Sequence, residues 1–155
     1  MGGDLIQTPQ RRWIQGAYES VQRGTLIVLN TVLSNLVAEN RYSALSLKNA
    51  SAGYQVTAGK TLYLTKAFIT SNLAATGWVL GSGTTDPGIN QIAAPTDPRS
   101  EDTYTIGAAN PHILITANVV YEIDYYAAIA AGRYPFVQTG AQSGVQRFTF
   151  IGHEE

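Results

Sequence analysis

Short β-rich segments alternate with clusters of glycine, proline and asparagine from Tyr42 to the end of the chain. About eight of these segments have the length of a strand, among them residues 54–57, 112–116, 134–138 and 145–151. After residue 40, no stretch has the three- and four-residue apolar spacing of an amphipathic helix, so the crossover helices of a parallel sheet are missing. The pattern predicts an all-β protein, a jelly-roll-like antiparallel β-sandwich with an extended N-terminal arm.

The strand with the clearest pattern covers residues 119–129. Alternate side chains of a strand point to opposite faces. One face would hold Glu122, Asp124 and Tyr126. The other face would be apolar and carry Val119, Tyr121, Ile123, Tyr125 and Ile129. Such alternation predicts a sheet with one buried face and one face in water.

A second strand is expected at residues 61–70, which are rich in β-branched and aromatic types. Strict alternation divides its side chains into two faces, Leu62, Leu64 and Phe68 against Tyr63, Thr65 and Ala67. Because both sets contain apolar residues, we expect both faces of this strand to be partly covered.

Residues 25–40 fit two different elements. Leu26, Leu29 and Leu33 follow the spacing of an amphipathic helix, whereas the β-branched start of the segment suits a buried strand. The polar, glycine-containing residues 1–24 are typical of an arm. We therefore divide the chain into an arm at residues 1–24 and a sandwich domain at residues 25–155.

Cysteine is absent, and histidine occurs only at His112 and His153. The chain therefore has no thiol nucleophile, no thiolate metal ligand and few imidazoles for acid–base catalysis. We expect His112 at a strand edge and His153 in a salt-linked tail beside two glutamates. With 155 residues the chain can build a core without metals or disulfides. These features favour a protein that is not an enzyme and uses no cofactor.

Charged residues make up 14% of the chain, against about 25% in an average soluble domain. Residues 1–66 contain seven basic and three acidic residues, a net charge of +4, whereas residues 67–155 contain three basic and eight acidic residues, a net charge of −5. Opposite charges in the two parts of a chain suit pairing with neighbouring subunits. The formal net charge of −1 predicts neither a nucleic-acid nor an anionic-membrane partner.

A glycine-rich segment at residues 53–61 has the lysine and threonine of a phosphate-binding loop, but five residues separate its glycines instead of four. A strand is expected directly after it, where phosphate binding requires a helix N-terminus. We therefore expect no nucleotide site.

Glu122 and Asp124 form a carboxylate pair, about 6.5–7 Å apart along the strand. A pair at this spacing could serve an inverting glycosidase, and together with Asp97, Glu101 or Asp102 it could hold a calcium ion. The polar face of an alternating strand is wet, whereas a general acid needs a desolvated site. A solvated or interface role is therefore the favoured interpretation.

Three stretches carry a resemblance to a known family, residues 54–65 (YQVTAGKTLYLT), 131–140 (AGRYPFVQTG) and 148–155 (FTFIGHEE). They resemble small β-sandwich proteins of tailed bacteriophages that decorate, or cement, the capsid. In that family an Ala-Gly-Lys turn opens a strand, and a Gly-Tyr-Glu or Gly-His-Glu ending closes the chain. Thr57 stands where the family pattern has proline.

The resemblance implies a non-enzymatic virion protein, a homotrimer that binds the outer surface of the major capsid protein lattice and stabilises the head. The N-terminal residues lack the basic-then-apolar order of a signal peptide, which agrees with assembly in the host cytoplasm. The arm would grip the shell. The residues expected at the capsid or subunit interface are Arg11, Arg12, Trp13, Tyr18, Arg23, Glu122, Asp124 and Tyr126.

Aromatic residues support a second hypothesis, a carbohydrate- or receptor-binding module of a phage tail or baseplate. Aromatic rings provide stacking platforms for sugars as well as contact area between protein subunits. The candidate platforms for a glycan are Trp78, Tyr104 and Tyr126.

Overall fold

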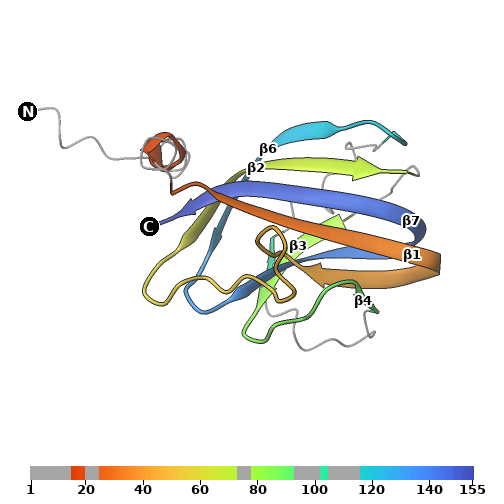
Figure 1. Ribbon diagram of the computed structural model, residues 1–155, viewed down its shortest axis with the longest axis horizontal. Helices are drawn as coiled ribbons and strands as arrows, with labels where there is room; N and C mark the ends of the chain where they lie inside the picture. Colours follow the sequence, from red (N-terminus) through yellow and green to blue (C-terminus); the bar gives the residue numbers. More distant parts are fainter. Residues whose placement is uncertain (1–14, 20–24, 73–77, 93–101, 105–115) are drawn as a thin grey trace, which may run out of the picture.

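The computed structural model describes residues 15–19, 25–72, 78–92, 102–104 and 116–155, with side chains described except at 35–40, 92, 102–104 and 140–143. In this part of the chain the regular structure consists of strands and one helical turn at residues 15–19 (Figure 1). The strands are β1 (Ile27–Ala44), β2 (Leu62–Ser71), β3 (Trp78–Gly83), β4 (Gln91–Ile92), β5 (Asp102–Tyr104), β6 (Tyr121–Ile129) and β7 (Tyr134–Glu154). The all-β prediction is confirmed, although the described part of the predicted arm is helical instead of extended.

The strands pair in a nested order, so that the first strand lies against the last. β1 pairs with β7, β2 with β6 and β3 with β5, all antiparallel. β7 also pairs with β2 and with β3, which joins these pairs into one sheet. A nested antiparallel hairpin rolled up in this way is a jelly roll. The predicted fold class is therefore correct.

β1 and β7 are long and bend, so that both contribute to both layers of the sandwich (Figure 1). The first half of β1 pairs with the second half of β7, beginning with Ile27 opposite Gly152, and β2 and β6 complete this layer. After a register shift the pairing resumes at Arg41 opposite Thr139. This second half lies in the other layer together with β3, β4 and β5.

Residues 25–40 contribute to strand β1, so the strand interpretation is correct and the helical one is wrong. Leu29, Thr31 and Leu33 point into the sandwich with exposed fractions of 5% or less, a period of two. Leu26, which the helical pattern groups with them, is 36% exposed.

Three expected strands differ from the structure. The segments at 134–138 and 145–151 are two parts of the single strand β7, because the glycines between them accompany a bend instead of ending the strand. Residues 54–57 form no strand, although Val56 donates its N–H to the carbonyl of Arg133 at 2.9 Å. The strand expected at 112–116 lies outside the described residues, except for Thr116.

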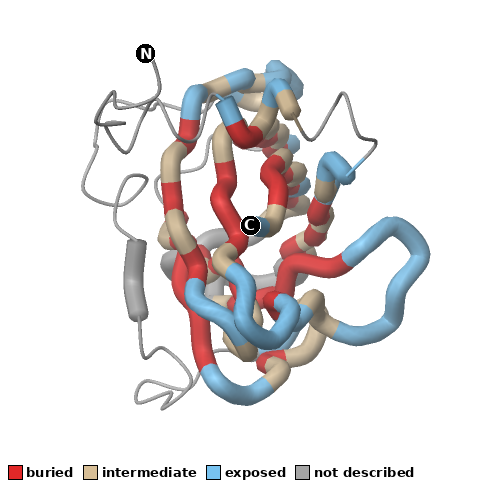
Figure 2. The backbone as a smooth tube through the Cα atoms, turned by 90° about the vertical axis from the view of Figure 1, so that its left-hand side faces the viewer, coloured by how far each residue is buried: buried red, intermediate tan, exposed pale blue. Residues whose placement is uncertain are grey.

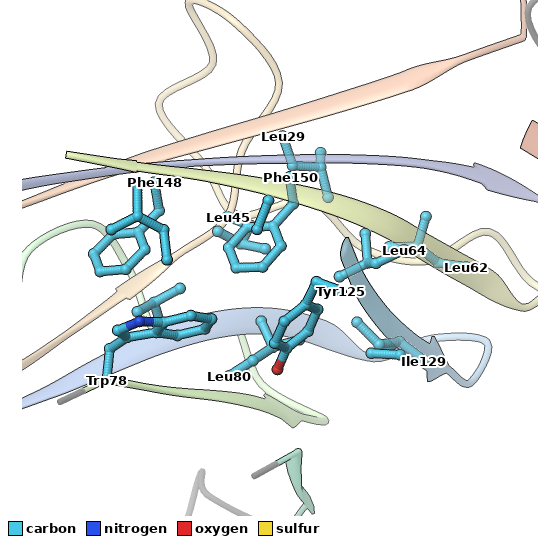
Figure 3. Close-up of a cluster of buried hydrophobic side chains, with 14 of the residues drawn as sticks. Leu29, Leu45, Leu62, Leu64, Trp78, Leu80, Tyr125, Ile129, Phe148 and Phe150 are labelled. Atoms are coloured by element: carbon cyan, nitrogen blue, oxygen red, sulfur yellow. The ribbon is translucent and has the colours of Figure 1, made fainter. Parts of the chain in front are cut away.

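The core lies between the two layers and is aromatic at its centre (Figure 3). Trp78 from β3 packs against Tyr125, Phe148 and Phe150, with ring centroids 5.5–6.0 Å apart. Aromatic pairs of this kind contribute about 0.5–1.5 kcal/mol each beyond the burial of their area. Buried residues follow the strands, whereas exposed residues gather in the connecting loops (Figure 2).

The alternation of β2 reverses inside the strand. Its register shifts between Leu64 and Lys66 against both neighbouring strands. Leu64 faces the core before the shift, and Ala67 faces it afterwards. The prediction that Phe68 shares a face with Leu64 is therefore wrong, because an odd number of positions now separates residues on the same face.

Candidate interaction surface

The layer of β1, β7, β2 and β6 turns one face away from the core, and we call this surface the outer face. Strand register aligns three rows across it, Val28 with Ile151 and Lys66, Asn30 with Thr149 and Phe68, and Val32 with Arg147 and Thr70. Glu122, Asp124 and Tyr126 of β6 continue the face beyond β2. Only Arg147 and Lys66 among the nine aligned residues are charged. Across β1, β7 and β2 the outer face therefore combines hydroxyl, aliphatic and aromatic side chains with two cations, and on β6 it adds the carboxylates of Glu122 and Asp124.

Glu122 and Asp124 share the wet face of β6, as the alternation predicts. Their side chains are 57% and 71% exposed. Lys66 Nζ lies 2.5 Å from Glu122 Oε1 and 4.0 Å from Asp124 Oδ1. The hydrogen bond to Glu122 raises the pKa of Lys66. The geometry is that of a surface ion pair with two exposed carboxylates, which differs from the desolvated acid of a glycosidase.

The hypothetical calcium ligands are only partly described. Asp97 and Glu101 lie outside the described residues, and Asp102 begins β5 with its side chain not described. Within the described residues, no three His, Asp or Glu side chains lie together so that they could hold a metal ion.

Trp78 is not a surface platform, so that part of the glycan hypothesis is wrong. Its side chain is 2% exposed and belongs to the aromatic centre of the core. Tyr104 lies in β5 without a described side chain. Of the three candidate platforms, Tyr126 is the one whose described side chain is partly exposed at the surface. A buried tryptophan and an exposed one have the same local sequence pattern in a short strand, so the sequence could not separate them.

His153 is also misplaced by the sequence interpretation. It is 3% exposed within β7 instead of lying in a tail, and its ring stacks on Tyr63 with centroids 5.5 Å apart and an interplanar angle of 22°. Gly16 of the helical turn lies directly over this ring, because a Cβ added at Gly16 would overlap the imidazole. His112 lies outside the described residues.

Of the interface residues expected in the arm, the structure describes Tyr18. It lies on the helical turn and is 66% exposed. Arg11, Arg12, Trp13 and Arg23 lie outside the described residues. The turn itself is held against the outer face at its His153 end through Gly16.

The three stretches that carry the family resemblance meet at one end of the sandwich. Glu154 accepts hydrogen bonds from the Tyr54 hydroxyl at 2.6 Å and from the Thr57 N–H at 2.9 Å. Val56 and Gly132 connect the first stretch to the second, since Gly132 donates its N–H to the Val56 carbonyl at 2.9 Å. We call this group the terminal cluster. It locks the C-terminal strand to the turn that precedes β2.

Burial works against the charged form of Glu154, but the hydrogen bonds from Thr57 and Tyr54 and the charge of Lys60 outweigh burial and lower the pKa of this carboxyl. Burial and the neighbouring Glu154 raise the pKa of Tyr54. The pair is therefore a carboxylate and a neutral phenol across the physiological pH range.

Asn90 occupies a position at the edge of β1 that sequence reasoning missed. It has a left-handed backbone, with φ of 51°, and leads into β4. Its N–H donates to Ser43 Oγ at 2.8 Å, and its carbonyl accepts from Arg41 at 3.0 Å. An asparagine in a long loop is a common turn residue, so only its partners distinguish it.

Comparisons with protein-family models, with curated proteins and with solved structures found no match to this chain. In the described residues, no helix has both the length and the apolar content needed to cross a membrane.

Proposed function

We propose that this chain is a non-enzymatic structural protein of a virion, which binds the outer surface of the major capsid protein lattice as a homotrimer and stabilises the head. The observation that supports this most is the outer face, where seven of the nine aligned residues on β1, β7 and β2 are uncharged and the carboxylates lie on the edge strand β6. Contact surfaces between proteins combine aliphatic and aromatic area with a depletion of charge at their centre.

Two further observations agree with the proposal. The stretches that resemble capsid decoration proteins form the terminal cluster, so they act together as one structural unit at one end of the fold. The helical turn of the arm packs on the same outer face through Gly16. An arm that starts from an interface is well placed to reach a neighbouring subunit.

The experiment has two parts. Light scattering at low micromolar concentration measures the mass of the full chain, for which we expect a trimer. Cosedimentation with expanded capsids of the matching major capsid protein then measures binding, for which we expect saturation. Removal of residues 1–24 should weaken capsid binding. A protein that is strictly monomeric and does not sediment with capsids would contradict the proposal.

A matched pair of variants localises the contact. Phe68→Lys places a charge in the middle row of the outer face, whereas Gln55→Lys places the same charge on an exposed loop residue. We expect the first variant to lose capsid binding or trimer formation and the second to keep both. Equal behaviour of the two variants would exclude the outer face as the contact surface.

A further inference from the structure

Among the described residues, the edge of β1 that faces away from β7 has one pairing position without a partner between two occupied ones. Asn30 and Ser46 exchange backbone hydrogen bonds of 2.8 and 3.0 Å. Ser34 donates its N–H to Asn90 Oδ1 at 3.0 Å and accepts from Asn90 Nδ2 at 3.3 Å. The N–H and C=O of every second residue in a strand point to the same side, and the register from residue 30 to residue 34 is uninterrupted. Val32 therefore directs its N–H and C=O outward between them.

In the described part of the chain, no backbone hydrogen bond from a loop segment reaches Val32. Sheet edges in natural proteins are usually blocked by charges, prolines or covering segments, because open edges pair with other chains. Among the described segments, Ser46 and Asn90 cover β1 at Asn30 and Ser34, and none covers it at Val32. This interruption marks a place where a second chain can pair.

A groove of about 560 Å³ surrounds the open position. Its walls include Leu47 and Ile89, and Leu47 is 47% exposed. Lys48 and Arg147 are the charged residues of its lining, which contains no carboxylate. The groove therefore offers an apolar wall, a backbone donor and acceptor, and two positive charges.

Ser46 and Asn90 limit what can enter the groove. The strand rises about 13–14 Å from Asn30 to Ser34, so a full-length strand cannot pair there without displacing both segments. One extended residue, through its own N–H and C=O, or one primary carboxamide presents a donor and an acceptor on the same side, which is what Val32 requires. The carboxamide of Asn90 already satisfies Ser34 in this manner.

We propose that Val32 pairs with the N–H and C=O of one residue, or with one side-chain carboxamide, in a loop of a partner protein, and that an acidic side chain of that loop lies against Lys48 and Arg147. The proposal rests on the proposed function only in taking the capsid protein as the source of the loop. The test of the Val32 site uses peptides alone. Failure of the peptides to bind would therefore leave the outcome of the capsid-binding experiment open.

Two blocked pentapeptides serve as probes, Gly-Asp-Asn-Asp-Gly and its counterpart Gly-Lys-Asn-Lys-Gly. Nuclear magnetic resonance titration of the full chain follows the amide signals of Val32, Leu47 and Arg147. We expect saturable shifts with the acidic peptide, with a dissociation constant of about 1 mM, and none with the basic peptide. Equal shifts with both peptides, or no saturable shift at Val32, would overturn the proposal.

Three variants separate the backbone contact from the charge contact. Val32→Pro removes the outward N–H without removing a hydrogen bond to β7, a change that edge strands tolerate. Arg147→Glu should lower the affinity for the acidic peptide about two- to fivefold. Lys60→Glu makes a comparable charge change about 27 Å away along the direction of β7 and should have no effect. If Val32→Pro does not fold, the comparison of Arg147→Glu with Lys60→Glu tests the site. Equal affinities of these two variants for the acidic peptide would reject it.

Discussion

The carboxamide of Asn90 pairs with the backbone of Ser34, 56 residues earlier in the chain, as a neighbouring strand would. It accepts from the Ser34 N–H at 3.0 Å and donates to the Ser34 carbonyl at 3.3 Å. Because its own N–H is held by Ser43 at 2.8 Å, the side chain is oriented from both sides. One residue thus connects the two halves of β1 across the bend of the jelly roll.

Asn90→Ala should lower the free energy of unfolding by about 3–4 kcal/mol, because the backbone groups of Ser34 lose both partners, about 2 kcal/mol, and alanine is strained in the left-handed backbone, about 1–2 kcal/mol. Urea denaturation measures this loss, and amide exchange should be faster at Ser34. Asn49→Ala is the matched control, since Asn49 also has a left-handed backbone, with φ of 65°, and is exposed. It should cost about 1–2 kcal/mol for the backbone strain alone. Equal losses and unchanged exchange at Ser34 would show that only backbone strain matters at Asn90.

Glu154→Gln should make the free energy of unfolding less dependent on pH in the acidic range. Hydrogen bonds from Thr57 and Tyr54 lower the pKa of Glu154 in the folded state from its ordinary value of 4.5. Its contribution is therefore complete above that value and is lost as pH falls through the folded pKa. We expect the stability difference between the wild type and the variant to shrink on acidification.

Urea denaturation at a series of pH values measures the effect of Glu154→Gln. Glu155→Gln removes an equal charge from the exposed neighbouring residue and serves as the control. A difference that stays constant from neutral to strongly acidic pH would contradict the assigned role of the carboxylate.

Trp78→Ala should destabilise the fold by about 3–5 kcal/mol, because a buried aromatic side chain is removed from the core. Tyr126→Ala, on the outer face, should have a much smaller effect. Chemical denaturation of both variants tests the correction from surface platform to core residue. A Trp78→Ala variant as stable as the wild type would be incompatible with this position.

Gly16→Val should displace the helical turn from β7, because a side chain at this residue would occupy the space of the His153 ring. We expect faster amide exchange at His153 and altered ring signals of Tyr63, on which His153 stacks. Tyr18→Ala, at an exposed residue of the same turn, is the control and should leave both signals unchanged. If the two variants behave alike, the contact between Gly16 and His153 does not hold the turn.

Local periodicity was sufficient to predict the wet and buried faces of β6. Glu122 and Asp124 are exposed, whereas Tyr125 and Ile129 are fully buried, as alternation requires. In β2 the same rule failed after Leu64, because the register shift is a property of the pairing with β6 and β7. A rule based on one strand has no information about its partners.

Strand alternation also explains which candidate surfaces could be predicted from the sequence. The positions of Glu122, Asp124 and Tyr126 follow from strand geometry alone. The opening at Val32 does not, since it depends on Ser46 and Asn90, which approach the edge from two loops. Long-range hydrogen bonds of this kind leave no periodic trace in the sequence.

Local sequence pattern was enough to predict an antiparallel β protein, because turn residues recur at strand spacing and no crossover helices follow. It also determined the face of β6 that meets water. The burial of Trp78 and His153, the joining of distant stretches in the terminal cluster, and the gap at Val32 among the described segments follow from tertiary packing instead. These features arise when the nested hairpin rolls up and brings residues up to 100 positions apart, such as Tyr54 and Glu154, into hydrogen-bond contact.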